Sequence, residues 1–158
     1  MTPENLRELA TILSASEVCA VDTESSDKDP HTAELFGVSF SVKKGEAFYV
    51  PVVESDLNGI NRNAVISTLK GVLEGPIKVV GHNLKYDYVL LRRNGIKITN
   101  VHFDTLLAAY DCFGDWDLLN LPFVAKRLLG KDIKSYKEVV CKRQSILDVP
   151  FNELLTHA

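Results

Sequence analysis

The pattern of apolar positions in the first third of the chain predicts one helix followed by three strands. Thr2 can cap a helix and Pro3 fits its first turn, and apolar residues then recur at helical spacing. Short apolar or alternating runs at residues 18–21, 35–42 and 47–52 predict strands. Because the connections between these strands are short, we expect them to form an antiparallel meander.

The rest of the pattern alternates helices with strands. In chain order we expect a helix over 61–74, a strand over 77–80, a helix from Asn83 to Asn94, a strand over 96–103, and helices over 105–112 and 118–129. A strand–helix–strand connection favours parallel pairing. The sequence therefore predicts one α/β domain whose mixed sheet combines an antiparallel meander with parallel strands and is flanked by helices.

Composition is that of an ordinary globular protein and excludes few partners. No apolar run among the 158 residues approaches the ~20 residues of a membrane span, so we expect a cytoplasmic protein without a membrane partner. A net charge of -3 does not by itself indicate a nucleic-acid binder, although an acidic site can bind a polyanion through metal ions. The cysteines are widely spaced, and Cys19 lies in an apolar run typical of the core.

Acidic residues gather where two of the expected strands end. Asp22 and Glu24 are two residues apart after the strand at 18–21, so their side chains point to the same face. Asp87 follows Asn83 by one helical turn, near the start of the next helix. If the two strands are neighbours, three carboxylates converge, and their repulsion raises a pKa or demands a cation. Mg²⁺ or Mn²⁺, with oxygen ligands, fits that demand.

Each of these residues also has a simpler explanation when taken alone. Asp22 and Glu24 fit a solvated loop after a strand, Asp87 fits the exposed face of an amphipathic helix, and Asn83 fits a helix cap. Their combination is more informative, because open α/β sheets tend to place their sites at such strand ends.

The motifs that carry these acids resemble a known family. Val21-Asp22-Thr23-Glu24, Gly81-His82-Asn83-Leu84-Lys85-Tyr86-Asp87 and Phe103-Asp104-Thr105 follow one another as in the proofreading 3′→5′ exonuclease domains of bacterial family A DNA polymerases. The resemblance extends from the first strand to residue 158. It implies a ribonuclease H-like fold, four carboxylates, two divalent ions and removal of nucleotides from a single-stranded or frayed 3′ end of DNA.

The resemblance also assigns roles to individual residues. Asp22, Glu24 and Asp87 would be catalytic and would bind the two Mg²⁺ or Mn²⁺ ions, while Thr23, His82 and Asn83 would contact the substrate. Asp104 would cap the helix that starts at Thr105. Three aromatic residues, Tyr110, Phe113 and Trp116, have two interpretations: stacking on bases or packing within the fold.

The C-terminal segment departs from the family. On the register set by residues 149–158, His157 stands where the family has the tyrosine of its third motif, and the chain ends before the fourth carboxylate. We expect residues 1–158 to be an exonuclease domain truncated just before that motif and belonging to a longer chain with a polymerase domain. His157 is a candidate general base, and we expect the isolated domain to be weakly active or inactive.

Two other functions remain open from the sequence. One is a ribonuclease D-like 3′→5′ exoribonuclease, since the resemblance at superfamily level does not separate RNA from DNA. The other is a catalytically silent domain that serves as a structural platform for a polymerase. The presence of Asp22, Glu24 and Asp87 argues against the silent domain.

Overall fold

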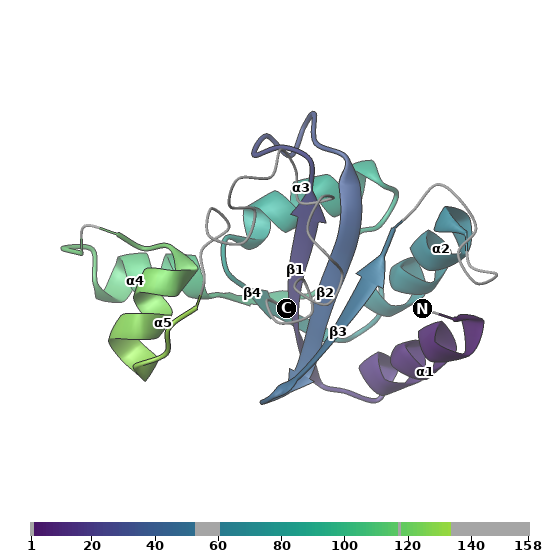
Figure 1. Cartoon of the computed structure of the whole chain (residues 1–158), viewed down its shortest axis with the longest axis horizontal. Coiled ribbons are helices and arrows are strands. Elements are labelled where there is room, and N and C mark those ends of the chain that lie inside the picture. The colour runs from purple at the N-terminus through teal and green to yellow at the C-terminus, as the bar shows by residue number, and fades with distance from the viewer. Residues whose placement is uncertain (1, 53–60, 117, 134–158) are drawn as a thin grey trace.

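A computed structural model describes residues 2–52, 61–116 and 118–133 as an α/β fold (Figure 1). The strands are β1 (Val18–Ser25), β2 (Leu35–Lys43), β3 (Glu46–Pro51), β4 (Lys78–Gly81) and β5 (Val101–Asp104). The helices are α1 (Pro3–Ser14), α2 (Arg62–Leu73), α3 (Leu84–Arg93), α4 (Thr105–Cys112) and α5 (Leu121–Leu129). This confirms the predicted mixed sheet with flanking helices.

Within the described residues the five strands form one sheet in the order β3-β2-β1-β4-β5. The pairs β1–β2 and β2–β3 are antiparallel, which confirms the predicted meander, and β1–β4 and β4–β5 are parallel. The strand that carries Asp22 and Glu24 therefore lies at the centre of the sheet, next to the strand that leads into α3. This order brings the two acidic segments together.

The helix ends follow the polar residues that the sequence offers as caps. The side chain of Thr2 accepts a hydrogen bond from the backbone N–H of Asn5, and Asn61 caps α2 in the same way. Asn120 caps α5, so this helix begins at Leu121 and not at the predicted residue 118. Gly130 ends α5 in a left-handed conformation with φ of 66°, which glycine adopts without strain.

One apolar core joins the sheet to α1, α2 and α3. It includes Leu13 of α1, Leu69 of α2 and Leu90 of α3, none of which exposes more than 1% of its surface. Cys19 on β1 is fully buried in this core, as predicted. Figure 1 shows α1 and α2 side by side against the sheet, away from the strand ends where α3 begins. None of the described helices is both long and apolar enough to cross a membrane.

Two strands differ in length from the prediction. β1 continues to Ser25, because β2 pairs with it as far as that residue, so Asp22 and Glu24 belong to the strand itself. β5 begins at Val101 rather than residue 96. Ile96 and Ile98 are buried, but their burial comes from packing and not from a place in the sheet, which explains the misleading apolar pattern.

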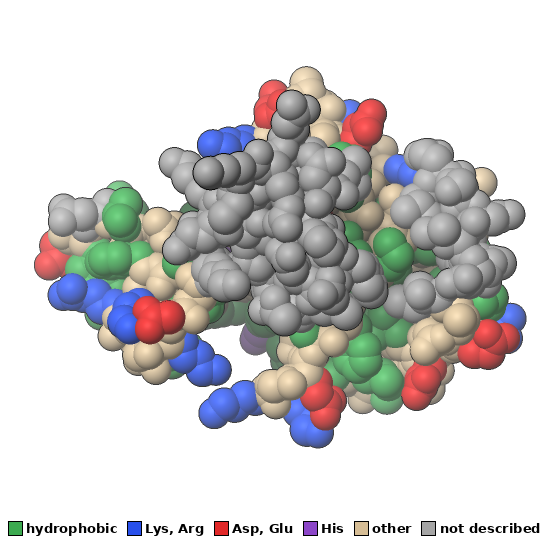
Figure 2. Space-filling model, in the orientation of Figure 1, with side chains coloured by type: hydrophobic (Ala, Val, Ile, Leu, Met, Phe, Trp, Pro, Cys, Tyr) green, Lys and Arg blue, Asp and Glu red, His purple; other side chains and the backbone are tan. Residues whose placement is uncertain are grey.

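Helices α4 and α5 project from one side of the sheet as a pair (Figure 1). Their apolar side chains are visible on the surface of this pair, with Lys and Arg around them (Figure 2). Phe113 stacks on Trp116 with ring centroids 4.2 Å apart, Phe123 meets the same indole edge-on, and the guanidinium of Arg127 lies 4.9 Å from its centroid. These contacts favour packing over base stacking for Phe113 and Trp116, whereas Tyr110 is exposed.

Candidate active site

The side chains of Asp22 and Glu24 lie on the same face of β1, and both residues pair with β2. Their cross-strand partners are Ser39 and Gly37. The residues between and beside them, Val21 and Thr23, are buried on the other face, as strand alternation requires. Asp22 is exposed and Glu24 is half-buried, so both carboxylates are open to a ligand.

Asp87 comes from the first turn of α3 and is buried, with 3% of its surface exposed. Its Oδ1 accepts two hydrogen bonds from Thr23, one from the backbone N–H at 2.8 Å and one from the hydroxyl at 2.7 Å. Asp87 is therefore hydrogen-bonded to Thr23, the residue that lies between Asp22 and Glu24 in the chain. The sequence predicted that these three acids converge, and the structure brings them to one end of β1.

The approach of α3 to β1 depends on where the β1–β4 ladder ends. The last paired residues are Ala20 and Val80, after which β4 turns into α3. A Cβ atom on Gly81 would lie 2.5 Å from the Leu84 side chain and 2.9 Å from the carbonyl oxygen of Val21. Glycine is needed at this turn, because any larger residue would push α3 away from the strand.

Asn83 follows Gly81 in a left-handed conformation, with φ of 65°. It stands at the N-cap position of α3, but its side chain makes no capping hydrogen bond, so the simpler explanation of Asn83 as a cap is wrong. The capping group is Asp104 at the end of β5, whose carboxylate accepts hydrogen bonds from the backbone N–H groups of Asn83 and Leu84. Asp104 also caps α4, as predicted, through the N–H of Leu106.

Burial and nearby negative charges raise the pKa of all three carboxylates. Solvent reaches Asp22, but protein surrounds it on most sides, and this loss of hydration, with the charges of Asp87 and Glu24, raises the pKa of Asp22 to about 7. Burial followed by the charge of Asp87 raises the pKa of Glu24. Burial also raises the pKa of Asp87, although the hydrogen bonds from Thr23 act in the opposite direction.

Clustered carboxylates with raised pKa values suit a hard divalent cation. Such an ion prefers oxygen ligands and relieves the mutual repulsion of the acids. Within residues 2–52, 61–116 and 118–133, however, no group of three or more His, Cys, Asp or Glu side chains is close enough to form a complete metal site. The donor chemistry of Asp22, Glu24 and Asp87 nevertheless fits the expected ions, since all three side chains offer carboxylate oxygens.

Two hollows flank the carboxylates. One, of about 300 Å³, is largely apolar and is lined by Asp22, Gly81 and His82 among others. The second, the polar hollow, has a volume of about 580 Å³ and is lined by the polar residues 23–28 with Asn83 and Tyr86. The substrate-binding candidates are thus divided: His82 lies on the side of Asp22, whereas Thr23 and Asn83 lie on the side of Glu24.

His82 is fixed by a short chain of hydrogen bonds. Its Nδ1 lies 2.8 Å from the hydroxyl of Thr105, which donates to the carbonyl oxygen of Gly81 at 3.0 Å. Burial lowers the pKa of His82, although a hydrogen bond with the backbone of Leu119 and the charge of Asp104 oppose that effect. His82 is therefore neutral at neutral pH and held in one orientation.

Tyr49 on β3 is a site residue that the sequence did not indicate. Its ring packs on Gly37, since a Cβ atom added to that glycine would lie 2.2 Å from the phenol oxygen. Gly37 is in turn the cross-strand partner of Glu24. Burial and the charge of Glu24 raise the pKa of Tyr49 to about 12. Only the register of three strands places this phenol near Glu24, so no local pattern could have found it. His157 lies outside the described residues.

The chain matches a known protein family over its whole length. A profile described as 3′-5′ exonuclease matches residues 1–158, the whole of the chain. The chain belongs to this exonuclease family. The membership agrees with the motifs around Asp22 and Asp87, and it confirms the resemblance to polymerase exonuclease domains.

Curated relatives of this exonuclease chain are DNA polymerases. DNA polymerase I of Borreliella burgdorferi is 32% identical over 149 residues, which cover 94% of this chain and 16% of the relative. DNA polymerase I of Pseudomonas aeruginosa is 34% identical over 136 residues, which cover 82% of this chain and 15% of the relative. The exonuclease chain thus spans less than a fifth of the length of these relatives, and it corresponds to their 3′-5′ exonuclease domain.

Solved structures share the ribonuclease H-like fold of this exonuclease domain. Escherichia coli RNase D has a TM-score of 0.69 at 19% identity and covers 98% of this chain and 38% of its own. Pol1 from M. smegmatis, in complex with DNA primer-template and dNTP, has a TM-score of 0.69 at 19% identity over 85% of this chain and 23% of its own. At these identities the likeness shows the fold alone, and it confirms the predicted fold class.

Proposed function

We propose that this domain removes nucleotides from the 3′ end of single-stranded or frayed DNA by hydrolysing the terminal phosphodiester. Asp22, Glu24 and Asp87 would hold two divalent ions, Mg²⁺ or Mn²⁺. The observation that supports this most strongly is the gathering of three carboxylates with raised pKa values at one end of β1. Without a cation, that arrangement only destabilises the fold.

The roles of the residues follow from their positions. Asp22 and Glu24 are accessible to ligands and would bind the ions directly, whereas Asp87 is buried and would bind from the side of α3. When bound, the ions would supply charge stabilisation for the phosphodiester and an activated water. The domain itself would exclude bulk water from Asp87 and orient the substrate between the flanking hollows.

The polar hollow is our candidate site for the 3′-terminal nucleotide. It adjoins Glu24 and carries hydrogen-bonding groups from Thr23 and Asn83, as well as the cationic side chain of Lys28. Lys28 supplies a positive charge for a phosphate in an otherwise acidic region. His82, neutral and oriented on the opposite side, would contact the substrate next to Asp22.

The wider context of the domain is also a proposal. The curated relatives are DNA polymerases, so we propose that the domain works beside a polymerase domain in a longer cytoplasmic protein and acts in proofreading. His157 is proposed as a general base near the third motif. We expect residues 1–158 alone to be weakly active, because the described residues supply three of the four carboxylates expected.

DNA is the preferred substrate in this proposal, because the curated relatives that match are DNA polymerases. An exoribonuclease is the second candidate, since RNase D shares the fold over 98% of this chain. A silent structural domain is disfavoured by the intact set of Asp22, Glu24 and Asp87.

A digestion assay tests the proposal. Excess protein is incubated with 5′-labelled single-stranded DNA, or with RNA of the same sequence, in Mn²⁺ or in EDTA. We expect a ladder that shortens from the 3′ end of the DNA in Mn²⁺ only, and no ladder with Asp22→Ala. Shortening of RNA alone would favour the exoribonuclease. Equal activity of wild type and Asp22→Ala would reject the catalytic role of this site.

A further inference from the structure

Thr23 makes two hydrogen bonds to the same oxygen of Asp87. Its backbone N–H lies 2.8 Å and its hydroxyl 2.7 Å from Oδ1, and both residues are buried. Two donors on one oxygen restrict both the position and the rotation of a carboxylate. Buried Asp87 therefore has a fixed orientation before any ligand binds.

The N–H of Thr23 is available for this contact because of the sheet topology. β1 pairs with β4 only as far as Ala20, and β4 then turns into α3. Among the described strands, none pairs with β1 beyond that point on this side, and the carboxylate of Asp87 accepts a hydrogen bond from the N–H of Thr23 there. The contact thus satisfies a buried backbone donor as well as the acid.

Strand alternation makes Thr23 the link among all three carboxylates. Asp22 and Glu24 flank it and face the opposite side of the strand, while Thr23 faces α3. Thr23 is joined to two of the acids by peptide bonds and to the third by hydrogen bonds. Its position therefore sets the spacing between Asp87 on α3 and the pair on β1.

We propose that Thr23 is a positioning residue whose hydroxyl fixes Asp87 relative to Asp22 and Glu24 and thereby tunes the affinity of the site for a divalent cation. This inference rests on the proposed function, because it presumes that the three acids bind a cation. The alternative is that the hydroxyl only attaches α3 to β1. The two differ in what loss of the hydroxyl changes: cation affinity in the first case, stability alone in the second.

Four variants of the whole chain separate these roles. Thr23→Val keeps the backbone N–H and the branched shape but removes the hydroxyl, and Thr23→Ala removes the hydroxyl together with the branch. Thr23→Ser keeps the hydroxyl. Thr68→Val is the matched control, since the Thr68 hydroxyl donates to the carbonyl oxygen of Ala64 within α2, away from the acids.

The readouts are the Tm without metal and the Mn²⁺ dissociation constant from calorimetry. Loss of an outer partner of a metal ligand typically weakens metal binding by about 10–100-fold, so we expect Thr23→Val to raise the dissociation constant at least about tenfold. Thr23→Ser and Thr68→Val should stay near the wild-type value. If Thr23→Val does not fold, Thr23→Ala is judged by the same criterion.

The possible results distinguish this inference from the proposed function. Wild-type Mn²⁺ affinity in a folded Thr23→Val or Thr23→Ala protein, whatever its Tm, would overturn the positioning role alone. Absence of Mn²⁺ binding by the wild type would overturn the proposed function and this inference with it. Weaker binding in Thr23→Val that Thr23→Ser does not share would support the role of the hydroxyl.

Discussion

The carboxylate of Asp104 holds the backbone of Asn83 in its left-handed conformation. Oδ1 of Asp104 lies 2.9 Å from the N–H of Asn83, and Oδ2 lies 2.8 Å from the N–H of Leu84. The same Oδ1 accepts the N–H of Leu106 at 2.8 Å. One acid at the end of β5 thus caps both α3 and α4, and it sets the direction in which α3 presents Asp87 to β1.

Replacing Asp104 should therefore weaken both the fold and the site. Asp104→Asn keeps one acceptor oxygen but places an amide NH₂ against a backbone N–H. We expect a loss of about 1–3 kcal/mol in the free energy of unfolding in urea, since one of the partly buried N–H groups of Leu84 and Leu106 loses its acceptor. Asp111→Asn, on the exposed surface of α4, should stay within about 0.5 kcal/mol of wild type. Equal stability of the two variants would contradict the role of Asp104 as a double cap.

Alanine substitutions at Gly81 and at Gly71 should change the free energy of unfolding in opposite directions. Gly81→Ala should lower the free energy of unfolding by about 1–3 kcal/mol, because its Cβ would lie 2.9 Å from the fixed carbonyl oxygen of Val21. Gly71→Ala in α2 should raise it by about 0.5–1 kcal/mol, since nothing lies within 4 Å and alanine favours helix. Urea denaturation of both variants measures the contrast. A neutral Gly81→Ala would mean that α3 does not need its close approach to β1.

The raised pKa of Asp22 predicts an unusual dependence of stability on pH in EDTA. The folded pKa is about 7 against an ordinary 3.8, so the folded chain binds more protons between these values, and ionisation of Asp22 lowers the stability progressively as pH rises from about 4 to about 7. Asp22→Asn should therefore match the wild-type Tm near pH 4 and exceed it at pH 8. Solvent screens part of the effect, so we expect a difference of about 2 °C.

Adding Mn²⁺ at pH 8 should raise the Tm of the wild type above that of Asp22→Asn, because only the wild type keeps the Asp22 carboxylate as a metal ligand. A Tm difference between wild type and Asp22→Asn that does not change from pH 4 to pH 8 would contradict the repulsion among the carboxylates.

Lys28 should contribute one phosphate contact to DNA binding. Its loop is anchored to α3: the Tyr86 hydroxyl donates to the carbonyl oxygen of Asp27, and Arg93 donates to those of Pro30 and Ala33. With single-stranded DNA, the slope of log K against log salt should fall in magnitude by about 0.7 in Lys28→Ala.

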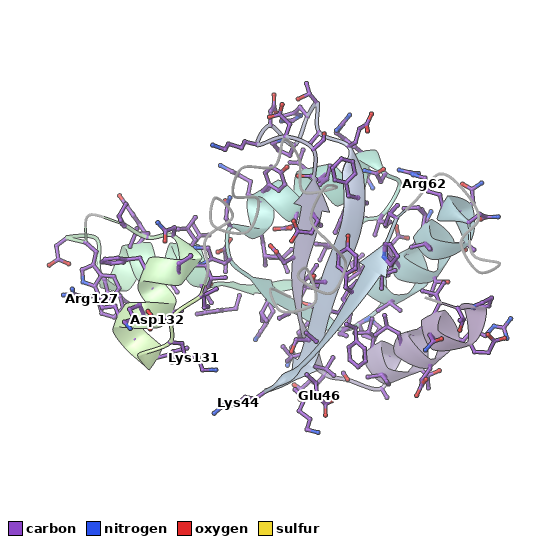
Figure 3. The ribbon with its side chains drawn as sticks, in the orientation of Figure 1. Lys44, Glu46, Arg62, Arg127, Lys131 and Asp132 are labelled. Atoms are coloured by element: carbon purple, nitrogen blue, oxygen red, sulfur yellow. The ribbon has the colours of Figure 1, made fainter. Side chains whose placement is uncertain are left out.

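Lys44→Ala is the control for Lys28, since Lys44 lies at the β2–β3 turn, far from α3 (Figure 3). Fluorescence anisotropy at several salt concentrations gives both slopes. The same slope for the two variants would remove Lys28 from the binding site.

Local sequence patterns predicted those parts of the site that depend on periodicity. The apolar run at 18–21 and its continuation fix the alternation that puts Asp22 and Glu24 on one face. The spacing from Asn83 to Asp87 correctly placed the acid in the first turn of α3. Such features need only the geometry of one strand or one helix.

Contacts between distant segments could not be predicted in this way. Asp104 reaches Asn83 because β4 and β5 pair in parallel with Gly81 opposite Asp104, a register that the sequence does not state. The bond between Thr23 and Asp87 requires the ladder to end at Ala20. The family motifs identified these residues as important, but their physical roles depend on strand register.

Anomalous diffraction from crystals of the domain soaked in Mn²⁺ tests most directly whether Asp22, Glu24 and Asp87 bind a divalent cation. We expect an anomalous peak at about 2.1 Å from carboxylate oxygens of Asp22, Glu24 or Asp87, with Asp22 as a ligand. The peak should be absent from crystals of Asp22→Asn. A well-diffracting crystal with no Mn²⁺ at these acids, or with Mn²⁺ bound only elsewhere, would contradict the assignment of this cluster as the metal-dependent exonuclease site.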